Sequence, residues 1–112
     1  MQVLYDTATP ADEPAPVASA VRLRLALREL GIEADVHDGY GLALVSVWVG
    51  LVVWCDGDRF WWRASWDDRR KRTVYAWHPA HDPERAAQRI AFRYRDLRAT
   101  HDKSTAVEDG DR

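Results

Sequence analysis

Hydrophobic residues recur at helical spacing in two stretches of the chain, which lie on either side of a middle section with strand-like patterns. In Val17–Leu30, alanines and leucines fall on one face and arginines on the other, as in an amphipathic helix. Gly31 follows in a position that suits the left-handed end of a helix. Before the second stretch, Asp82 is a favourable N-cap and Pro83 a favourable first residue. The pattern therefore predicts helices over residues 17–30 and 83–97.

The middle section, residues 33–78, predicts antiparallel strands separated by polar or glycine-containing turns. The expected strands are Glu33–Asp38, Leu42–Cys55, Arg59–Trp66 and Thr73–Trp77. The longest of them is apolar at both parities, which is typical of a strand covered on both faces. Gly50 indicates a bulge or bend within this strand, and Asp56-Gly57 indicates a tight hairpin after it.

These elements predict an α+β domain in the order helix, four-stranded antiparallel meander, helix (α-β-β-β-β-α), with the helices packed on one face of the sheet. If the short first strand does not form, the order becomes α-β-β-β-α. Three prolines in residues 1–16 indicate an extended or flexible N-terminal segment. Residues 17–98 form the single predicted domain. Residues 99–112 lack periodicity and are expected to be a disordered acidic tail.

The composition fits one globular domain, with 112 residues, 46% hydrophobic and 30% charged. The single cysteine excludes an internal disulfide framework. The apolar run of fourteen residues over Leu42–Cys55 is too short to span a membrane. No signal-peptide pattern is visible, so we expect a cytoplasmic protein. Richness in Ala, Arg, Asp and Val is common in proteins from GC-rich bacterial genomes.

The net charge of −2 hides a strong asymmetry along the chain. Residues 17–58 contain three basic and six acidic residues (−3), whereas residues 59–98 contain eleven basic and five acidic residues (+6). A cationic second half on a nearly neutral chain favours an anionic partner or a complementary subunit.

Six tryptophans lie between positions 48 and 77. Trp48 and Trp54 belong to the long apolar strand, and Trp62 and Trp66 share the parity of Phe60 in the next strand. These four side chains are expected in the core. Trp61 has the opposite parity, between two arginines, and is expected at the surface.

The predicted binding surface has six residues. Five of them lie where two neighbouring strands present the same parity, namely Arg59, Trp61, Arg63, Tyr75 and Trp77, and the sixth is Phe92 on the second helix. Three interpretations are open. The rings complete the core, with the arginines over them as cation–π partners. Alternatively, they form a protein or dimer interface, in which Trp, Tyr and Arg are the common anchors. Or they stack nucleic-acid bases while the arginines neutralise phosphates.

Two further features are candidates for contacts. Phe92 lies opposite the apolar face of the second helix, among arginines, and is expected to meet the tail or a second subunit. The predicted basic tip of a hairpin consists of Arg69, Arg70, Lys71 and Arg72. It either binds phosphate or is a solvated loop neutralised by the preceding aspartates.

The sequence contains no pattern typical of catalysis or metal binding. His78 and His81 are three residues apart, but Pro79 breaks the regularity and Asp82 is better used as a helix cap, so no metal site is predicted. Cys55 stands beside an aspartate, whose charge raises the pKa of the thiol, and no nucleophilic role is expected. No cofactor is expected.

The sequence thus predicts a small non-enzymatic interaction or regulatory protein. It would bind a protein partner and also itself, as a homodimer, through the aromatic and arginine surface. The alternative is a nucleic-acid-binding module that uses the same sheet face and the basic tip. A third hypothesis is a small-ligand binder or enzyme with an aromatic pocket. No membrane partner is expected.

Overall fold

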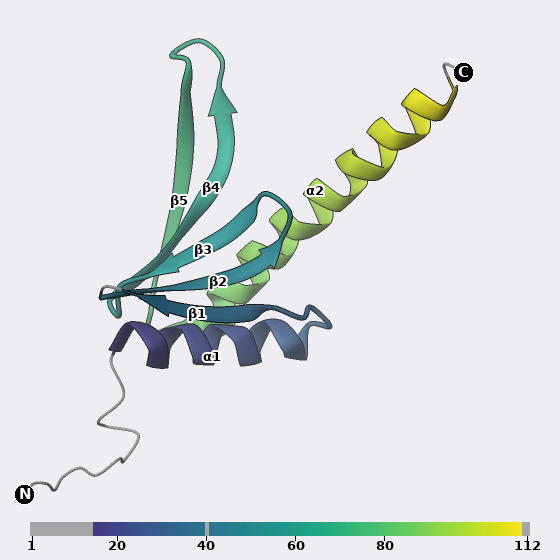
Figure 1. Cartoon of the computed structure of the whole chain (residues 1–112). Helices are drawn as coiled ribbons and strands as arrows, with labels where there is room; N and C mark the ends of the chain where they lie inside the picture. The colour runs from purple at the N-terminus through teal and green to yellow at the C-terminus, as the bar shows by residue number, and fades with distance from the viewer. Residues whose placement is uncertain (1–14, 40, 111–112) are drawn as a thin grey trace, which may run out of the picture.

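The computed structural model describes residues 15–39 and 41–110, with side chains as far as His101, and this part of the chain forms a two-layer α+β domain (Figure 1). Its elements are α1 (Ala15–Glu29), β1 (Asp35–Gly39), β2 (Leu42–Trp48), β3 (Leu51–Cys55), β4 (Arg59–Asp67), β5 (Arg72–Pro79) and α2 (Pro83–Gly110). The strands form one antiparallel sheet in the order β1-β2-β3-β4-β5. The predicted α+β class, the meander and the packing of the helices against the sheet are confirmed.

The predicted number of four strands was wrong, because the long apolar segment Leu42–Cys55 folds into a hairpin. Val49 and Gly50 form the turn after β2, and Trp48 pairs with Leu51 across it. Gly50 has a φ of 78°, a left-handed conformation that glycine adopts without steric cost. The chain therefore reverses direction where the sequence suggested a bend, and β2 and β3 become neighbouring strands.

In β2 and β3 every second residue is buried, so each strand is covered on one face. The prediction that both faces of this segment are covered was therefore also wrong. The buried residues are Ala43, Val45, Val47, Leu51, Val53 and Cys55. With Phe60 and Trp62 of β4, they pack against the leucines of α1 and the small apolar side chains of α2. The intervening residues, including Leu44 and Trp54, project to the opposite face of the sheet.

The end of α1 and the start of α2 lie at signals that the sequence carries. The N–H of Ile32 donates to the carbonyl of Leu27 (3.0 Å), and the N–H of Gly31 donates to that of Arg28 (2.9 Å). These are the two bonds of a Schellman motif, which ends a helix. At the start of α2, the side chain of Asp82 accepts the N–H of the third helical residue at 3.2 Å, as an N-cap does.

The predicted domain boundaries differ from the observed elements at both ends. α1 begins at Ala15, inside the segment 1–16 that was predicted to be extended, while residues 1–14 of that segment lie outside the described residues. α2 continues past residue 98 as far as Gly110, so the predicted start of the tail falls within a helix. Figure 1 shows this last part of α2 leading away from the sheet and from α1.

Candidate functional site

The face of the sheet opposite the core carries a row of directly paired residues that crosses all five strands. His37 pairs with Leu44, Leu44 with Trp54, Trp54 with Trp61, and Trp61 with Trp77. Residues that pair directly across antiparallel strands project on the same side of the sheet. Three indole rings therefore stand in consecutive strands on the face away from the core.

We call this surface the outer aromatic face and define it by Trp54, Trp61, Trp66, Tyr75 and Trp77. Tyr75, Trp77 and Trp66 are 59%, 56% and 54% exposed, and Trp61 is half-buried among its neighbours. Two hollows lie between the rings, one of about 420 Å³ and one of about 370 Å³, and Trp61 and Tyr75 line both of them. Exposed apolar surface of this extent is typical of contact sites.

A β-bulge explains why the sequence placed Trp66 in the core. The register of β4 against β5 shifts between Arg63 and Ser65, and one extra residue moves every later side chain to the other face. Trp66 consequently pairs with Thr73, which has the parity of Tyr75. The prediction of a buried Trp66 was wrong, as was that of Trp54, which is 38% exposed because of the β2–β3 hairpin.

The other two tryptophans lie on the core side of the sheet. Trp62 is buried, as predicted, and the guanidinium of Arg89 lies 5.1 Å from its ring centre. Trp48 is half-buried, and its ring meets that of Tyr94 edge-on, with 6.1 Å between the centroids. These two rings connect the sheet to α2.

Charges of both signs border the outer aromatic face. Arg59 lies with its guanidinium 5.4 Å from the ring centre of Trp77, and Arg63 pairs with Tyr75. At the far edge, Asp35 of β1 has the parity of His37 and is exposed. The face thus combines an aromatic centre with cations at one edge and an anion at the other.

A turn beside the outer aromatic face holds the carboxylate of Asp56 in place. Its Oδ1 accepts the backbone N–H groups of Asp58 (2.8 Å) and Arg59 (2.9 Å). Slight burial would raise the pKa of Asp56, but these hydrogen bonds and the positive charge of Arg59 hold the pKa below its ordinary value. The carboxylate is therefore engaged in the turn and is not a free acid or base.

Five of the six residues predicted for the binding surface lie together on the outer aromatic face or at its border, namely Arg59, Trp61, Arg63, Tyr75 and Trp77. Phe92 does not join them, because it belongs to α2 on the other side of the sheet. Trp54 and Trp66 were missed, since their parity depends on the β2–β3 hairpin and on the bulge in β4.

Phe92 lines a second surface, which we call the helix–hairpin groove. The groove has a volume of about 670 Å³ and is lined by Trp62, Ala64, Ser65, Ala76, Gln88, Arg89, Phe92, Arg93 and Asp96. It lies between α2 and the β4–β5 hairpin, which diverge from each other in Figure 1. Phe92 is 76% exposed there, while the strands contribute only small side chains besides Trp62.

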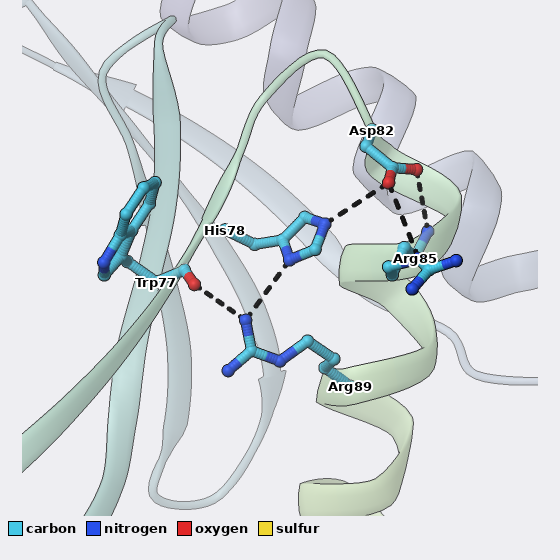
Figure 2. A network of polar contacts seen from close by, with 5 residues as sticks. All are labelled: Trp77, His78, Asp82, Arg85 and Arg89. Atoms are coloured by element: carbon cyan, nitrogen blue, oxygen red, sulfur yellow. Dashed lines mark hydrogen bonds and ion pairs between the residues drawn. The ribbon is translucent and has the colours of Figure 1, made fainter.

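A chain of polar contacts ties the end of β5 to the first turns of α2 at the base of this groove (Figure 2). Arg89 Nη1 donates to the carbonyl of Trp77 (2.7 Å) and to His78 Nδ1 (3.2 Å). A guanidinium can only donate, so His78 Nδ1 accepts and the ring hydrogen lies on Nε2. Nε2 then makes a long contact of 3.5 Å to Asp82 Oδ2. This chain holds α2 against the hairpin.

Asp82, at the end of this chain of contacts, serves the helix. The N–H of Arg85 lowers the pKa of Asp82, and the contact with His78 and the charge of Arg85 lower it further. Among the described residues, no group of three or more His, Cys, Asp or Glu side chains is placed to hold a metal ion. The contacts drawn in Figure 2 connect the end of β5 to the start of α2.

The basic tip is an internally bonded turn. Asp67 Oδ1 accepts the N–H groups of Arg69 (3.1 Å) and Arg70 (3.3 Å), and Lys71 Nζ lies 3.2 Å from Asp68 Oδ1. The two aspartates therefore neutralise part of the charge of the tip, whose cationic side chains, including Arg72, are all exposed.

Cys55 is fully buried in the core beneath α1. Burial and the charge of Asp56 raise the pKa of its thiol to about 12, against a smaller lowering by a hydrogen bond from Ser19. A thiol in this state is protonated at neutral pH and is a poor nucleophile.

Comparison of the chain with protein-family models, with curated proteins and with solved structures gives no match. Within residues 15–39 and 41–110, neither helix has the length and apolar character needed to cross a membrane.

Proposed function

We propose that this protein is a non-enzymatic binding protein that contacts another protein through the outer aromatic face. The observation that carries the proposal is the unbroken row Leu44, Trp54, Trp61 and Trp77 on the sheet face opposite the core. Each aromatic ring offers a large area whose removal from water is favourable, at roughly 25 cal/mol per Å². Trp, Tyr and Arg are also the residue types that contribute most to protein interfaces.

The chemistry around the rings favours a protein partner over nucleic acid. Leu42 and Leu44, which adjoin the rings, offer apolar surface but no plane on which a base can stack. Asp35 on the same face would repel a phosphate backbone, and Arg59 is already engaged with Trp77. An apolar centre with a rim of mixed charge is the usual composition of a protein interface.

The same face offers little to an enzyme or a small-ligand site. Specific ligand pockets combine apolar walls with a few convergent polar groups. The larger hollow contains Asp56 and Arg59 as its charged groups, but the carboxylate is bonded to the turn and the guanidinium lies over a ring. The predicted self-association has better support at the helix–hairpin groove than at this face.

Binding to a purified partner tests the proposal. The partner is first identified by affinity capture from the source organism, and its direct affinity is then measured by calorimetry with the wild type and with a Trp61→Ala/Trp77→Ala variant. Loss of two central aromatic residues is expected to raise Kd by at least ~30-fold. The matched control is Leu25→Ala, because Leu25 is an exposed apolar residue on α1, and it should leave Kd unchanged.

Equal affinities of the wild type and the double variant would contradict the proposal. Tryptophan fluorescence with a short single-stranded oligonucleotide at low salt supplies the second measurement. We expect no quenching. Salt-sensitive quenching that the double variant abolishes would instead establish the nucleic-acid alternative.

A further inference from the structure

α2 carries opposite net charges in its two halves. Residues 83–98 contain five arginines against two acidic residues (+3), whereas residues 99–110 contain three acidic residues against one lysine (−2). The basic half borders the helix–hairpin groove. The acidic half leads away from the rest of the molecule (Figure 1). A short polar helix is only marginally stable by itself in water, so a contact along its length would stabilise it.

The helix–hairpin groove has the shape and the charge to receive such a helix. Besides Trp62, its strand side consists of Ala64, Ser65 and Ala76, and small residues of this kind allow a helix to approach closely. On its helix side, Phe92 is exposed. In the described part of the chain, one buried side-chain nitrogen or oxygen atom lacks a hydrogen-bond partner, and this atom is the Nε of Arg93. The groove therefore presents an exposed ring and a guanidinium that pairs with Asp96 through Nη1 at 3.1 Å but leaves its Nε without an acceptor.

Residues spaced by seven along α2 mark the face that would meet a second helix. Arg85, Phe92, Ala99 and Ala106 follow one another at intervals of seven residues, the spacing of residues that stay on one seam between two helices. Phe92 is the large apolar residue of this series, and the two positions that follow it are alanines.

We infer that two copies of this chain form a dimer in which each α2 lies antiparallel to the other, inside the other copy's helix–hairpin groove. A parallel arrangement would set arginines against arginines. An antiparallel one brings the basic half of each helix against the acidic half of its partner. Each contact between the two copies then occurs twice, once on each side of a two-fold axis, as in other isologous dimers.

The opposite charges of the two halves of α2, and the lengths of these halves, place the two-fold axis near residue 98. With that centre, position 95 of each copy falls opposite position 102 of the other, and position 92 falls opposite positions 105 and 106. The acidic half of twelve residues spans roughly 18 Å, and the nine residues 88–96 along the groove span roughly 14 Å. Each groove is therefore covered by the other copy's helix and is incomplete without it. The outer aromatic face is not part of this contact.

Reversal of single charges tests the antiparallel arrangement. Arg95→Asp replaces both attractive pairs of the dimer with repulsive ones, and Asp102→Arg does the same with the opposite sign. Each variant alone should weaken dimerisation by at least ~10-fold in sedimentation equilibrium. The double variant Arg95→Asp/Asp102→Arg restores both attractive pairs and should dimerise like the wild type. A mixture of the two single variants should form the heterodimer in preference to either homodimer.

The controls separate this proposal from the proposed function. Trp61→Ala/Trp77→Ala should leave dimerisation unchanged, whereas Phe92→Ala should weaken it by at least ~10-fold. Circular dichroism checks that each variant is folded. A wild-type chain that stays monomeric over the whole concentration series would overturn the inference. So would a dimer that is lost in the tryptophan variant but kept in the charge variants, or a mixture of single variants that forms no heterodimer.

Discussion

Replacement of Gly50 by alanine tests the turn on which the outer aromatic face depends. Gly50 has a φ of 78°, and a Cβ added there would meet nothing within 4 Å. Any loss of stability therefore comes from the backbone conformation and not from a clash. A left-handed conformation costs an L-residue with a Cβ about 1–2 kcal/mol.

Gly39→Ala is the matched control, because a Cβ at Gly39 also meets nothing within 4 Å and its φ is not in the left-handed region. Both substitutions reduce the conformational freedom of the unfolded chain, which by itself stabilises a protein by about 0.4–1 kcal/mol. This contribution cancels in the difference between the variants. We therefore expect Gly50→Ala to be less stable than Gly39→Ala by about 1–2 kcal/mol.

Urea unfolding followed by tryptophan fluorescence gives the free energy of unfolding for both variants. With a urea dependence of about 1–1.5 kcal/mol per M for a chain of this size, the two midpoints should differ by roughly 1 M. Gly50→Asn should fall between them, since asparagine enters the left-handed region more easily than alanine does. Equal stabilities of the two alanine variants would mean that residue 50 is not left-handed. The β2–β3 hairpin, and with it the exposure of Trp54, would then be refuted.

Three further outcomes are expected, each measured by urea unfolding. Gly57→Ala should cost more than Gly50→Ala, because Gly57 combines a φ of 97° with a Cβ position 2.8 Å from the Cβ of Ala15. Arg89→Met should lower the free energy of unfolding by about 1 kcal/mol, because the hydrogen bonds to Trp77 and His78 are lost. The control Arg85→Met should have little effect, because the Nε of Arg85 lies 3.8 Å from the carboxylate of Asp82. The pKa of Cys55 is raised from 9.0 to about 12, and this contributes stability that is fully present below pH 9 and is lost as the pH rises towards 12. Cys55→Ala should reduce this loss of stability. An equal pH dependence of the free energy of unfolding in the wild type and the variant would contradict the prediction.

The elements that the sequence predicted correctly depend on local chemistry. Gly31 ends α1 and Asp82 begins α2 through hydrogen bonds within a few residues, so the residue type at one position is sufficient evidence. The parity of Phe60 and Trp62 was predictable for the same reason, because simple alternation holds from the Asp56-Gly57 turn to the bulge. The central part of the predicted binding surface follows from that alternation.

The errors arose where register depends on pairing between strands. Val49-Gly50 lacks the asparagine or aspartate that marks the commonest two-residue hairpins, so the segment was predicted as one strand. Its apolar residues at both parities suggested burial on two faces, but one parity belongs to the core and the other extends the outer aromatic face. The bulge in β4 has no glycine to mark it, and Trp66 therefore could not be placed from the sequence.

The β4–β5 hairpin carries different chemistry on its two faces, and this difference relates the two proposals. One face contributes Trp61, Tyr75 and Trp77 to the outer aromatic face, and the other contributes Ala64 and Ala76 to the helix–hairpin groove. A dimer formed through α2 would occupy the groove and leave both outer aromatic faces free. Such a dimer presents two equal binding sites, so a partner with two copies of the matching surface would be held more tightly than by either site alone. The contacts of Arg89 at the base of the groove connect the end of β5 to α2, and the helix–hairpin groove depends on that connection, whereas the outer aromatic face depends on the pairing of the strands.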